Sequence, residues 1–251
     1  MKTPYKFLPL ISPTYRTIRK VYQSFKYAGQ EVNCPICDRN FSSWLRQQEN
    51  GTCPSCDSKT RHRLLSLFLK KHSRIFDQPC RILHFAPDQC LRAKFQNRHN
   101  LEYTTADLSA PGVDVHTDLT NLIFDDNSFD AIFCSHVLEH IPNDRAAMRQ
   151  MYRVLSPNGI GYIQVPYNRY EKTDEDPNVT DPVEREKRFG QFDHLRVYGV
   201  DLKERLESVG FQVKEEYYAR QLDKSDRQRY GVWDDVIFCC TKLDRNNTTD
   251  I

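Results

Sequence analysis

The sequence predicts an α/β fold with a doubly wound, mostly parallel sheet, preceded by a small metal-binding element. Two short apolar runs, 130–134 and 160–165, flank a stretch with helical character. Strand, helix and strand in that order form a βαβ unit, and such a unit implies parallel strands. The motif Cys-Pro-x-Cys occurs twice before these elements. A chain of 251 residues is long enough for one sizeable core and one small appendage.

The composition is that of a soluble globular protein, with 28% charged and 39% hydrophobic residues. No apolar run approaches the roughly 20 residues that a membrane span needs. The N-terminus has no secretory signal pattern. The nine cysteines are therefore expected to be reduced, and the protein is expected to be cytoplasmic.

The charge is unevenly distributed along the chain. Residues 1–100 contain 18 Lys and Arg against 6 Asp and Glu, whereas residues 101–251 contain 18 against 28. A basic front half suggests an anionic partner, such as nucleic acid, a membrane surface or an acidic polymer. The alternative is that the two halves partly neutralise each other and that the remaining charges are solvated. The sequence leaves both interpretations open.

Residues 1–30 form a basic N-terminal segment with six Lys and Arg and no acidic residue. From Pro13 onward, apolar residues recur at spacings of three and four, which predicts an amphipathic helix. Its apolar face contains Tyr15, Ile18, Tyr22 and Phe25. A basic amphipathic helix can lie on a bilayer surface, but such a helix more often packs its apolar face on its own domain. We expect packing here.

Residues 31–59 are predicted to form a zinc ribbon. Cys34-Pro-Ile-Cys37 and Cys53-Pro-Ser-Cys56 give the spacing C-x2-C-x15-C-x2-C, which is typical of a four-thiolate zinc site. Four sulfur ligands close a tetrahedral site, so the expected role of the Zn²⁺ is structural. Asp38 and Asp57 follow the two motifs and are expected in the left-handed conformation. The other five cysteines lack ligand spacing and are expected to be buried small apolar residues.

A helix is predicted to begin near residue 60, where the main domain, 60–243, starts. Thr60 is its expected N-cap, and its apolar face is expected to connect the ribbon to the main domain. Arg61 and Arg63 either contact an anionic substrate or form a solvated flank. The solvated flank is the expected outcome.

Three predicted strands are each followed by a turn or an acidic residue. The strand 81–85 leads into the turn 86–90, the strand 101–106 ends at Asp107, and the strand 113–117 is followed by Asp118. Carboxyl ends of parallel strands meet at one edge of a sheet, and ligands bind there. The turn 86–90 holds no glycine, although glycine usually allows the backbone to approach a bound nucleotide closely.

Residues 113–166 carry three ordered motifs. The strings D-L-x-x-L-x-F-x-D-x-S-F-D, V-L-E-H-I and R-V-L-x-P-x-G follow one another within about fifty residues. They closely resemble the second half of a class I S-adenosylmethionine-dependent methyltransferase of type 11, and the resemblance extends over roughly 78–243. It implies a Rossmann-like sheet of seven strands, completed by a hairpin-like pair at 211–218 and 236–243.

The resemblance implies S-adenosylmethionine as the cofactor. Asp107 would accept hydrogen bonds from the ribose, Asp118 would lie beside the adenine amine, and Leu119 would cover the adenine ring. Ser135 and His136 would border the methionine moiety. The full expected set is Phe85, Ala86, Pro87, Asp107, Leu108, Asp118, Leu119, Ser135 and His136. The glycine-free turn departs from the family pattern, but the small Ala86 and the turn-forming Pro87 still allow close approach, so binding is expected.

Residues 136–140 spell His-x-x-Glu-His, an order also found in a class of metalloproteases. A protease is not expected, because that motif needs one continuous helix and His136 is predicted at a strand end. Some metal-dependent methyltransferases of the ubiquinone pathway and of small RNA carry a similar motif with a further histidine downstream. A divalent cation near Glu139, His140 and His194 is therefore one hypothesis. The expected alternative is that Glu139 and His140 cap and pack the following helix.

Residues 167–192 are predicted to form an acidic lid over the substrate, and His140 and His194 are the candidate catalytic bases. A helix at 200–209 is expected to end at Gly210. Residues 244–251 are predicted to be a flexible tail.

Three functions compete, and the first is expected. It is methyl transfer to an oxygen or nitrogen atom of a small molecule or glycan. The second is methylation of ribosomal RNA with the ribbon as a docking module. Phe41 and Trp44 are too few for base stacking, and RNA would have to pass the acidic lid. The third is a non-catalytic S-adenosylmethionine-binding module, suggested by the missing glycines. The basic front half is expected to dock on a partner or surface.

Overall fold

The computed structural model describes residues 13–45 and 51–244. The elements follow one another as α1 (Pro13–Lys26), β1 (Val32–Cys34), β2 (Arg39–Phe41), α2 (Thr60–His72), β3 (Cys80–Phe85), α3 (Gln89–Phe95), β4 (Leu101–Asp107), β5 (Val115–His116), β6 (Phe129–Ser135), η1 (Leu138–His140), α4 (Asp144–Val154), β7 (Leu155–Gln164), β8 (Asp174–Glu175), α5 (Pro182–Phe189), β9 (Arg196–Val197), α6 (Leu202–Glu207), β10 (Gln212–Glu216), η2 (Tyr218–Gln221), α7 (Lys224–Tyr230) and β11 (Ile237–Thr241).

Seven strands form the central sheet in the order β10-β11-β7-β6-β3-β4-β5. The five strands from β7 to β5 pair in parallel, while β11 and β10 run antiparallel at the other edge. The predicted α/β sheet, doubly wound and mostly parallel, is therefore confirmed. Phe85 of β3 is level with Ala106 of β4 and Cys134 of β6, so these three strands end at the same edge of the sheet.

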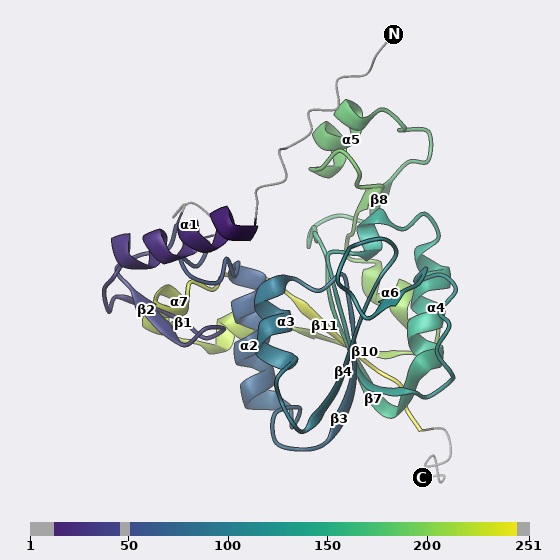
Figure 1. Cartoon of the computed structure of the whole chain (residues 1–251). Coiled ribbons are helices and arrows are strands. Elements are labelled where there is room, and N and C mark those ends of the chain that lie inside the picture. Colours follow the sequence, from purple (N-terminus) through teal and green to yellow (C-terminus); the bar gives the residue numbers. More distant parts are fainter. Residues whose placement is uncertain (1–12, 46–50, 245–251) are drawn as a thin grey trace.

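Helices cover both faces of the sheet. α2 and α3 lie on one face, and α4 and α6 lie on the other (Figure 1). Each face has its own buried hydrophobic cluster. The cluster under α2 and α3 continues into the N-terminal element, where it includes Phe41 and Trp44. The N-terminal element and the sheet thus share one core.

Several predicted boundaries are corrected. The predicted strand 113–117 is reduced to the two residues of β5. The predicted apolar run 160–165 belongs to a longer strand, β7, which begins at Leu155 and contains Asn158 at φ +62°. Thr60 is the first residue of α2 and Lys59 is the N-cap; the hydroxyl of Thr60 donates to the carbonyl of Gly231 instead. The predicted helix 200–209 shortens to α6, although Gly210 has the expected positive φ of +113°.

The predicted helix from Pro13 is present as α1, but the expectation that it packs its apolar face is wrong. Tyr15, Ile18, Tyr22 and Phe25 are 58–79% exposed. α1 is attached instead through its charged side, since Arg19 and Lys20 both pair with Asp57 of the second Cys motif. The side chains of Ile18, Tyr22 and Phe25 are therefore largely exposed to solvent.

Arg63 is neither a substrate contact nor a solvated flank, because it is completely buried at the junction of the N-terminal element and the sheet domain. Its guanidinium donates to the carbonyls of Gly51, Ser58, Tyr230 and Gly231 and lies 4.1 Å from the ring centroid of Trp44. Gly231 has φ +56°, and a Cβ there would lie 3.0 Å from Nη2 of Arg63. The close approach of this backbone therefore requires glycine.

The predicted lid contains β8 and α5, and α5 projects beyond the sheet edge at the top of Figure 1. Asp181 caps α5 by accepting from the amides of Val183 and Glu184. β8 pairs with β9, which returns the chain to the domain. No helix within 13–45 and 51–244 is long and apolar enough to cross a membrane. Residues 1–12 of the basic segment, and the predicted tail beyond Asp244, lie outside the described residues.

Candidate functional site

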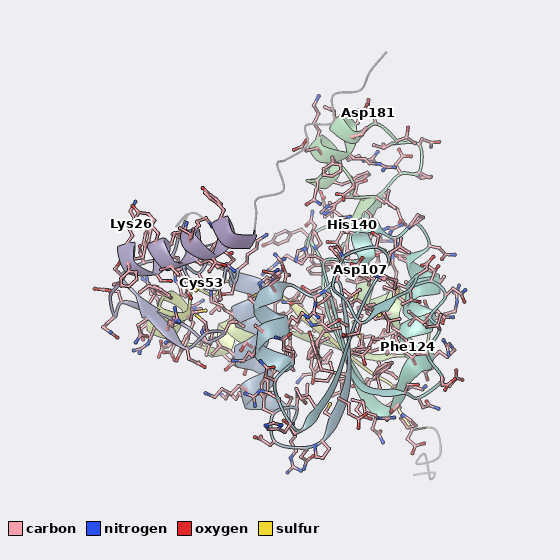
Figure 2. All side chains as sticks on the ribbon, in the orientation of Figure 1. Lys26, Cys53, Asp107, Phe124, His140 and Asp181 are labelled. Carbon is pink, nitrogen blue, oxygen red and sulfur yellow. The ribbon has the colours of Figure 1, made fainter. Side chains whose placement is uncertain are left out.

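A cavity of about 530 Å³ lies at the shared carboxyl edge of β3, β4 and β6, a volume typical of small-molecule sites. Asp107 and His140, which both line it, mark its position in Figure 2. Seven of the nine residues predicted to bind the cofactor line this cavity: Phe85, Ala86, Asp107, Leu108, Asp118, Leu119 and His136. Pro87 and Ser135 are not in the lining; the Ser135 hydroxyl is buried and donates to Gln164 Oε1.

The turn after β3 adopts the conformation that glycine usually provides. Ala86 has φ +44°, and its amide donates to the carbonyl of Ala106 at 2.9 Å. A left-handed conformation costs a non-glycine residue roughly 1–2 kcal/mol. The turn is held from outside the strand, because the carboxylate of Asp88 binds Arg61 at 3.2 Å and His62 at 2.7 Å. Arg61, predicted as a solvated flank, therefore supports the turn instead.

The hydrogen bonds of His62 define its protonation state. The amide of Lys59 donates to Nδ1, so the proton is on Nε2, which donates to Asp88. Burial lowers the pKa of His62, which keeps the ring neutral. Burial alone would raise the pKa of Asp88, but the bonds from His62 and Arg61 outweigh it and hold this pKa well below its usual range. Asp88 is thus a fixed anion beneath the turn.

The two predicted ligand aspartates are oriented by their own loops. Asp107 Oδ1 accepts from the amides of Ser109 at 2.8 Å and Ala110 at 2.7 Å. Asp118 Oδ1 accepts from the amide and the hydroxyl of Thr120. A carboxylate fixed through one oxygen can offer the other to a ligand hydroxyl or amine.

Glu139, His140 and His194 form a cluster beside the cavity, which His140 lines. One potential ligand atom from each lies within 4.8 Å of the others. Glu139 is completely buried, and neither of its oxygens has a hydrogen-bond partner among the described residues. His136 Nδ1 is 3.2 Å from Glu139 Oε1, but the geometry is not that of a hydrogen bond. The cap of α4 is Asn143, whose side chain accepts from Ala146, so the expectation that Glu139 and His140 cap this helix is wrong.

Two further residues hold this cluster and were not singled out in the sequence. Arg196 donates to the carbonyls of Leu138, Ile141 and Pro142, and Tyr198 donates to Asp144 Oδ2 at 2.9 Å. Both are buried. They fix the loop that carries Glu139 and His140, so the cluster is rigid even though its carboxylate is unpartnered.

The four cysteines of the two Cys motifs form a second cluster. Cys53 marks its position in Figure 2, apart from the cavity marked by Asp107 and His140. Sγ of Cys34 is 3.7 Å from Sγ of Cys56, and Sγ of Cys37 is 3.7 Å from Sγ of Cys53. A tetrahedron with Zn–S bonds of about 2.3 Å has edges of about 3.8 Å. These two opposite edges match those of a zinc tetrahedron, and all four sulfur atoms lie within 4.8 Å of one another.

The local backbone of the Cys motifs follows the sequence prediction. Asp38 and Asp57 have φ of +55° and +59°, which confirms their left-handed conformation. Their amides donate to the carbonyls of Cys34 and Cys53. The amides of Ser55 and Cys56 point at Sγ of Cys53. Each motif is thus a tight turn that directs two sulfurs to one point.

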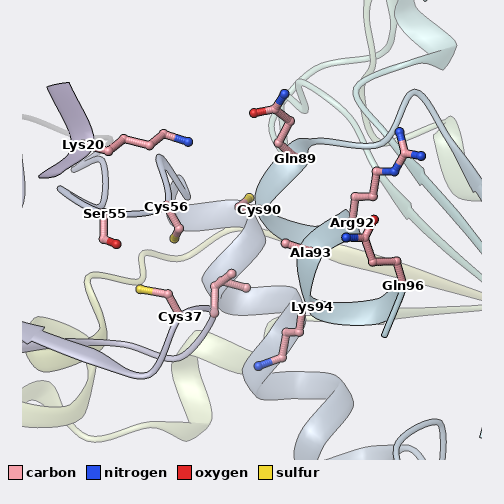
Figure 3. A pocket seen from close by; sticks show the side chains of 11 residues that line it. Lys20, Cys37, Ser55, Cys56, Gln89, Cys90, Arg92, Ala93, Lys94 and Gln96 are labelled. Atoms are coloured by element: carbon pink, nitrogen blue, oxygen red, sulfur yellow. The ribbon is translucent and has the colours of Figure 1, made fainter. Parts of the chain in front are cut away.

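A larger cavity of about 650 Å³ lies between the Cys motifs and α3 (Figure 3). Its cationic side chains already have protein partners. Lys20 pairs with Asp57, Lys94 donates to the carbonyl of Pro35 at 2.7 Å, and Arg92 donates to the carbonyl of Gly112. None of the residues predicted to bind the cofactor is in its lining. The cavity at the sheet edge is therefore the candidate active site.

Comparison with known proteins agrees with this site. Residues 82–163 match a family described as a methyltransferase domain. The demethylmenaquinone methyltransferase of Staphylococcus epidermidis is 46% identical over 46 residues, 18% of this chain and 19% of that protein. The 24-methylenesterol C-methyltransferase 2 of Arabidopsis thaliana is 31% identical over 121 residues, 48% of this chain and 33% of that protein. The matched part thus spans about a fifth to a third of these curated relatives.

A solved structure shares the fold. A chain in the complex between the Haloferax volcanii Trm112 methyltransferase activator and a methyltransferase superposes with a TM-score of 0.51 at 15% identity, and the match covers 73% of this chain and 91% of that chain. The family match over 82–163 and the strand order agree on the fold: the seven-stranded sheet is that of a Rossmann-like methyltransferase.

Proposed function

We propose that the protein transfers a methyl group from S-adenosylmethionine to an oxygen or nitrogen atom of a small molecule or of a glycan. The observation that carries the proposal is the cavity at the sheet edge, which seven predicted cofactor residues line. The matched relatives are named for demethylmenaquinone and a sterol, which supports a small acceptor.

In this proposal each end of the cofactor has its own partners. Asp107 accepts hydrogen bonds from the ribose hydroxyls, Asp118 binds the adenine amine, and Leu119 packs on the adenine ring. The turn from Phe85 to Pro87, with Ser135 and His136, borders the methionine moiety. The positive φ of Ala86 supports this, because it gives the turn the shape that glycine gives elsewhere.

The reaction needs an acceptor atom, a methyl carbon and a sulfonium sulfur in line, so positioning supplies most of the rate enhancement. His140 lines the cavity and is the proposed base for an acceptor that must lose a proton. His194 lies behind it, with the two ring centroids 4.8 Å apart, and is the second candidate.

The proposal assigns a structural Zn²⁺ to Cys34, Cys37, Cys53 and Cys56. The fit of the sulfur tetrahedron supports it. When bound, zinc would supply no chemistry to the reaction, because four thiolates leave no open coordination position. A thiolate site of this kind requires reduced cysteines, which supports the cytoplasm as the place of action.

We further propose that α1 docks the enzyme on an anionic bilayer surface. The exposed apolar face, Tyr15, Ile18, Val21, Tyr22 and Phe25, is the kind of surface that a basic interfacial helix buries among lipid headgroups. RNA remains the second candidate partner. The burial of Phe41 and Trp44, at 2% and 8% exposure, argues against base stacking on the ribbon.

Calorimetric titration with S-adenosylhomocysteine tests the cofactor site. The wild type should bind, and Asp107→Ala should bind at least about tenfold more weakly, which corresponds to about 1.4 kcal/mol. Asp125→Ala, which removes an exposed aspartate outside the cavity lining, is the matched control and should bind normally. Absence of binding to the wild type would refute the proposal.

Incubation with methyl-labelled S-adenosylmethionine tests the acceptor. Label should enter small-molecule or glycan fractions of a cell extract and not RNA. Label in RNA, together with RNA binding that weakens steeply with salt, would favour the ribosomal RNA alternative. Cofactor binding without label transfer to any fraction would favour the non-catalytic module.

A further inference from the structure

The turn after β3, residues 86–90, is held by side chains that do not touch the cavity. Its Asp88 binds Nε2 of His62 at 2.7 Å and Nη2 of Arg61 at 3.2 Å, and neither of these residues of α2 is in the cavity lining. A non-glycine residue keeps a positive φ only where its surroundings fix it. Ala86, at φ +44°, lies two residues before Asp88. The first turn of α2 therefore supports the shape of this turn.

His62 also connects the turn to its two neighbouring segments. Its Nδ1 accepts from the amide of Lys59 at 3.2 Å, and Sγ of Cys90, in the first turn of α3, lies 3.2 Å from the same nitrogen. The side chain of His62 is 1% exposed, so water cannot replace these partners. One buried imidazole thus joins the residue before α2, the turn after β3 and the start of α3.

The first Cys motif holds both helices directly. The carbonyl of Pro35, between Cys34 and Cys37, accepts from Nζ of Lys94 in α3 at 2.7 Å and from the hydroxyl of Ser66 in α2 at 3.4 Å. A displacement of this motif would therefore act on the two helices that flank the turn after β3.

The second Cys motif holds the start of α2. Ser58, two residues before this helix, is completely buried. Its carbonyl accepts from the amide of Cys53 at 2.9 Å and from Nη1 of Arg63 at 2.6 Å, and its hydroxyl is 3.2 Å from Sγ of Cys34. The position of Ser58 thus depends on both Cys motifs, and the position of the His62 ring depends on the segment that Ser58 begins.

We propose that the zinc ribbon and the turn after β3 form one cooperative unit, in which His62 is a positioning residue and metal binding by the four cysteines raises the affinity for S-adenosylmethionine. The inference rests on the proposed cofactor and zinc sites. With the Cys motifs fixed, the turn is ordered before the cofactor arrives, and a preorganised site loses less entropy on binding. Coupling between two sites is reciprocal, so the cofactor raises the zinc affinity by the same factor.

Calorimetric titration of the full-length protein with S-adenosylhomocysteine, with and without zinc, measures the coupling. We expect the zinc-loaded protein to bind at least about tenfold more tightly than the metal-free protein, which corresponds to about 1.4 kcal/mol. Saturating S-adenosylhomocysteine should raise the zinc affinity, measured by competition with a chelator, by the same factor. Equal affinity with and without zinc would overturn the coupling and leave the methyltransferase proposal standing. Absence of binding in both forms would overturn both proposals.

Two variants of His62 test the positioning role in zinc-loaded protein. His62→Leu loses the bond to Asp88 and should bind S-adenosylhomocysteine at least about tenfold more weakly. His62→Gln, whose amide can still donate to Asp88, should recover most of the affinity. Both should keep one zinc per chain. His72→Gln, at the exposed last position of α2, is the matched control. Full affinity in His62→Leu, or the same loss in both variants, would contradict the positioning role.

Lys94→Met provides a test that needs neither metal removal nor a change at His62. It removes the bond from α3 to the carbonyl of Pro35 and alters no cysteine and no residue of the cavity lining. It should weaken S-adenosylhomocysteine binding at least about threefold, as expected for a residue within a coupling network. If the metal-free protein or His62→Leu does not fold by circular dichroism, this variant decides. Unchanged affinity in Lys94→Met would show that the ribbon does not act on the cofactor site.

Discussion

The two clusters of potential metal ligands differ in how completely they are satisfied. The four cysteines lie at the edge lengths of a zinc tetrahedron, and backbone amides point at one of the sulfurs. The Glu139 cluster offers three ligands, has an unpartnered carboxylate, and opens through His140 to a cavity. A closed set stabilises a fold, and an open set is available for a ligand at a cost in stability.

The largest test of this contrast is Cys53→Ser. Because zinc binding to a closed site is coupled to folding, this variant should lose the zinc and more than about 4 kcal/mol of stability, a drop of roughly 10 °C or more in melting temperature. Elemental analysis and calorimetry measure both. Cys239→Ser, in β11 outside the cluster, should keep its zinc. A metal-free wild type with unchanged stability would contradict the closed site.

Arg63 provides the second test, because it connects the closed cluster to the sheet domain. Arg63→Ala removes four hydrogen bonds to backbone carbonyls, together with the contact to Trp44, and should cost about 3 kcal/mol. Arg63→Lys should cost nearly as much, since one ammonium cannot replace the planar fork. Urea denaturation measures the loss, with Arg74→Ala, at an exposed position, as the control. Equal stability of all three would show that the ribbon is independent of the sheet.

The sequence predicts a structural feature well when the residues that determine the feature are close together in the chain. The Cys spacing fixes the turns, and even the left-handed Asp38 and Asp57, because all the interacting atoms lie within a few residues. The strand ends and their ligand edge follow from the βαβ order. Arg63 was misread because its partners include Tyr230 and Gly231, far along the chain.

The same reason explains the other errors. The exposure of the α1 apolar face depends on what the rest of the protein leaves uncovered, which no helical periodicity reveals. The surroundings of Glu139 depend on His194 and Arg196, which follow the predicted lid in the sequence and lie beside Glu139 and its loop in the structure. The motif at 136–140 indicated that chemistry was present. It could not indicate that the carboxylate would be unpartnered.

His84, a buried histidine of strand β3, makes the stability of the protein depend on pH. Burial lowers the pKa of His84 to about 3, below the unfolded value of about 6.5. Between these values the unfolded state binds a proton that the folded state does not, so stability falls as the pH drops below 6.5, by up to about 1.4 kcal/mol per unit. His62, whose pKa is also lowered, acts in the same direction.

The pH effect is measured as unfolding free energy from pH 7.5 to 5.0. The wild type should lose about 2 kcal/mol or more over this range, and His84→Gln should show a flatter profile whatever its own stability. His99→Gln changes an exposed histidine and should leave the slope unchanged. A His84→Gln profile as steep as that of the wild type would show that the slope comes from other groups.

The smallest expected change in stability is that of Glu139→Gln, and it is opposite in sign to that of Cys53→Ser. Replacing a ligand of the closed cluster destabilises the fold, but Glu139→Gln should stabilise the protein, because it replaces a buried carboxylate whose oxygens accept no hydrogen bond among the described residues. We expect a gain of about 1 kcal/mol, or roughly 2–4 °C, measured by calorimetry. A Glu139→Gln variant less stable than the wild type would mean that the carboxylate is already compensated, and that the two clusters do not differ in the way described.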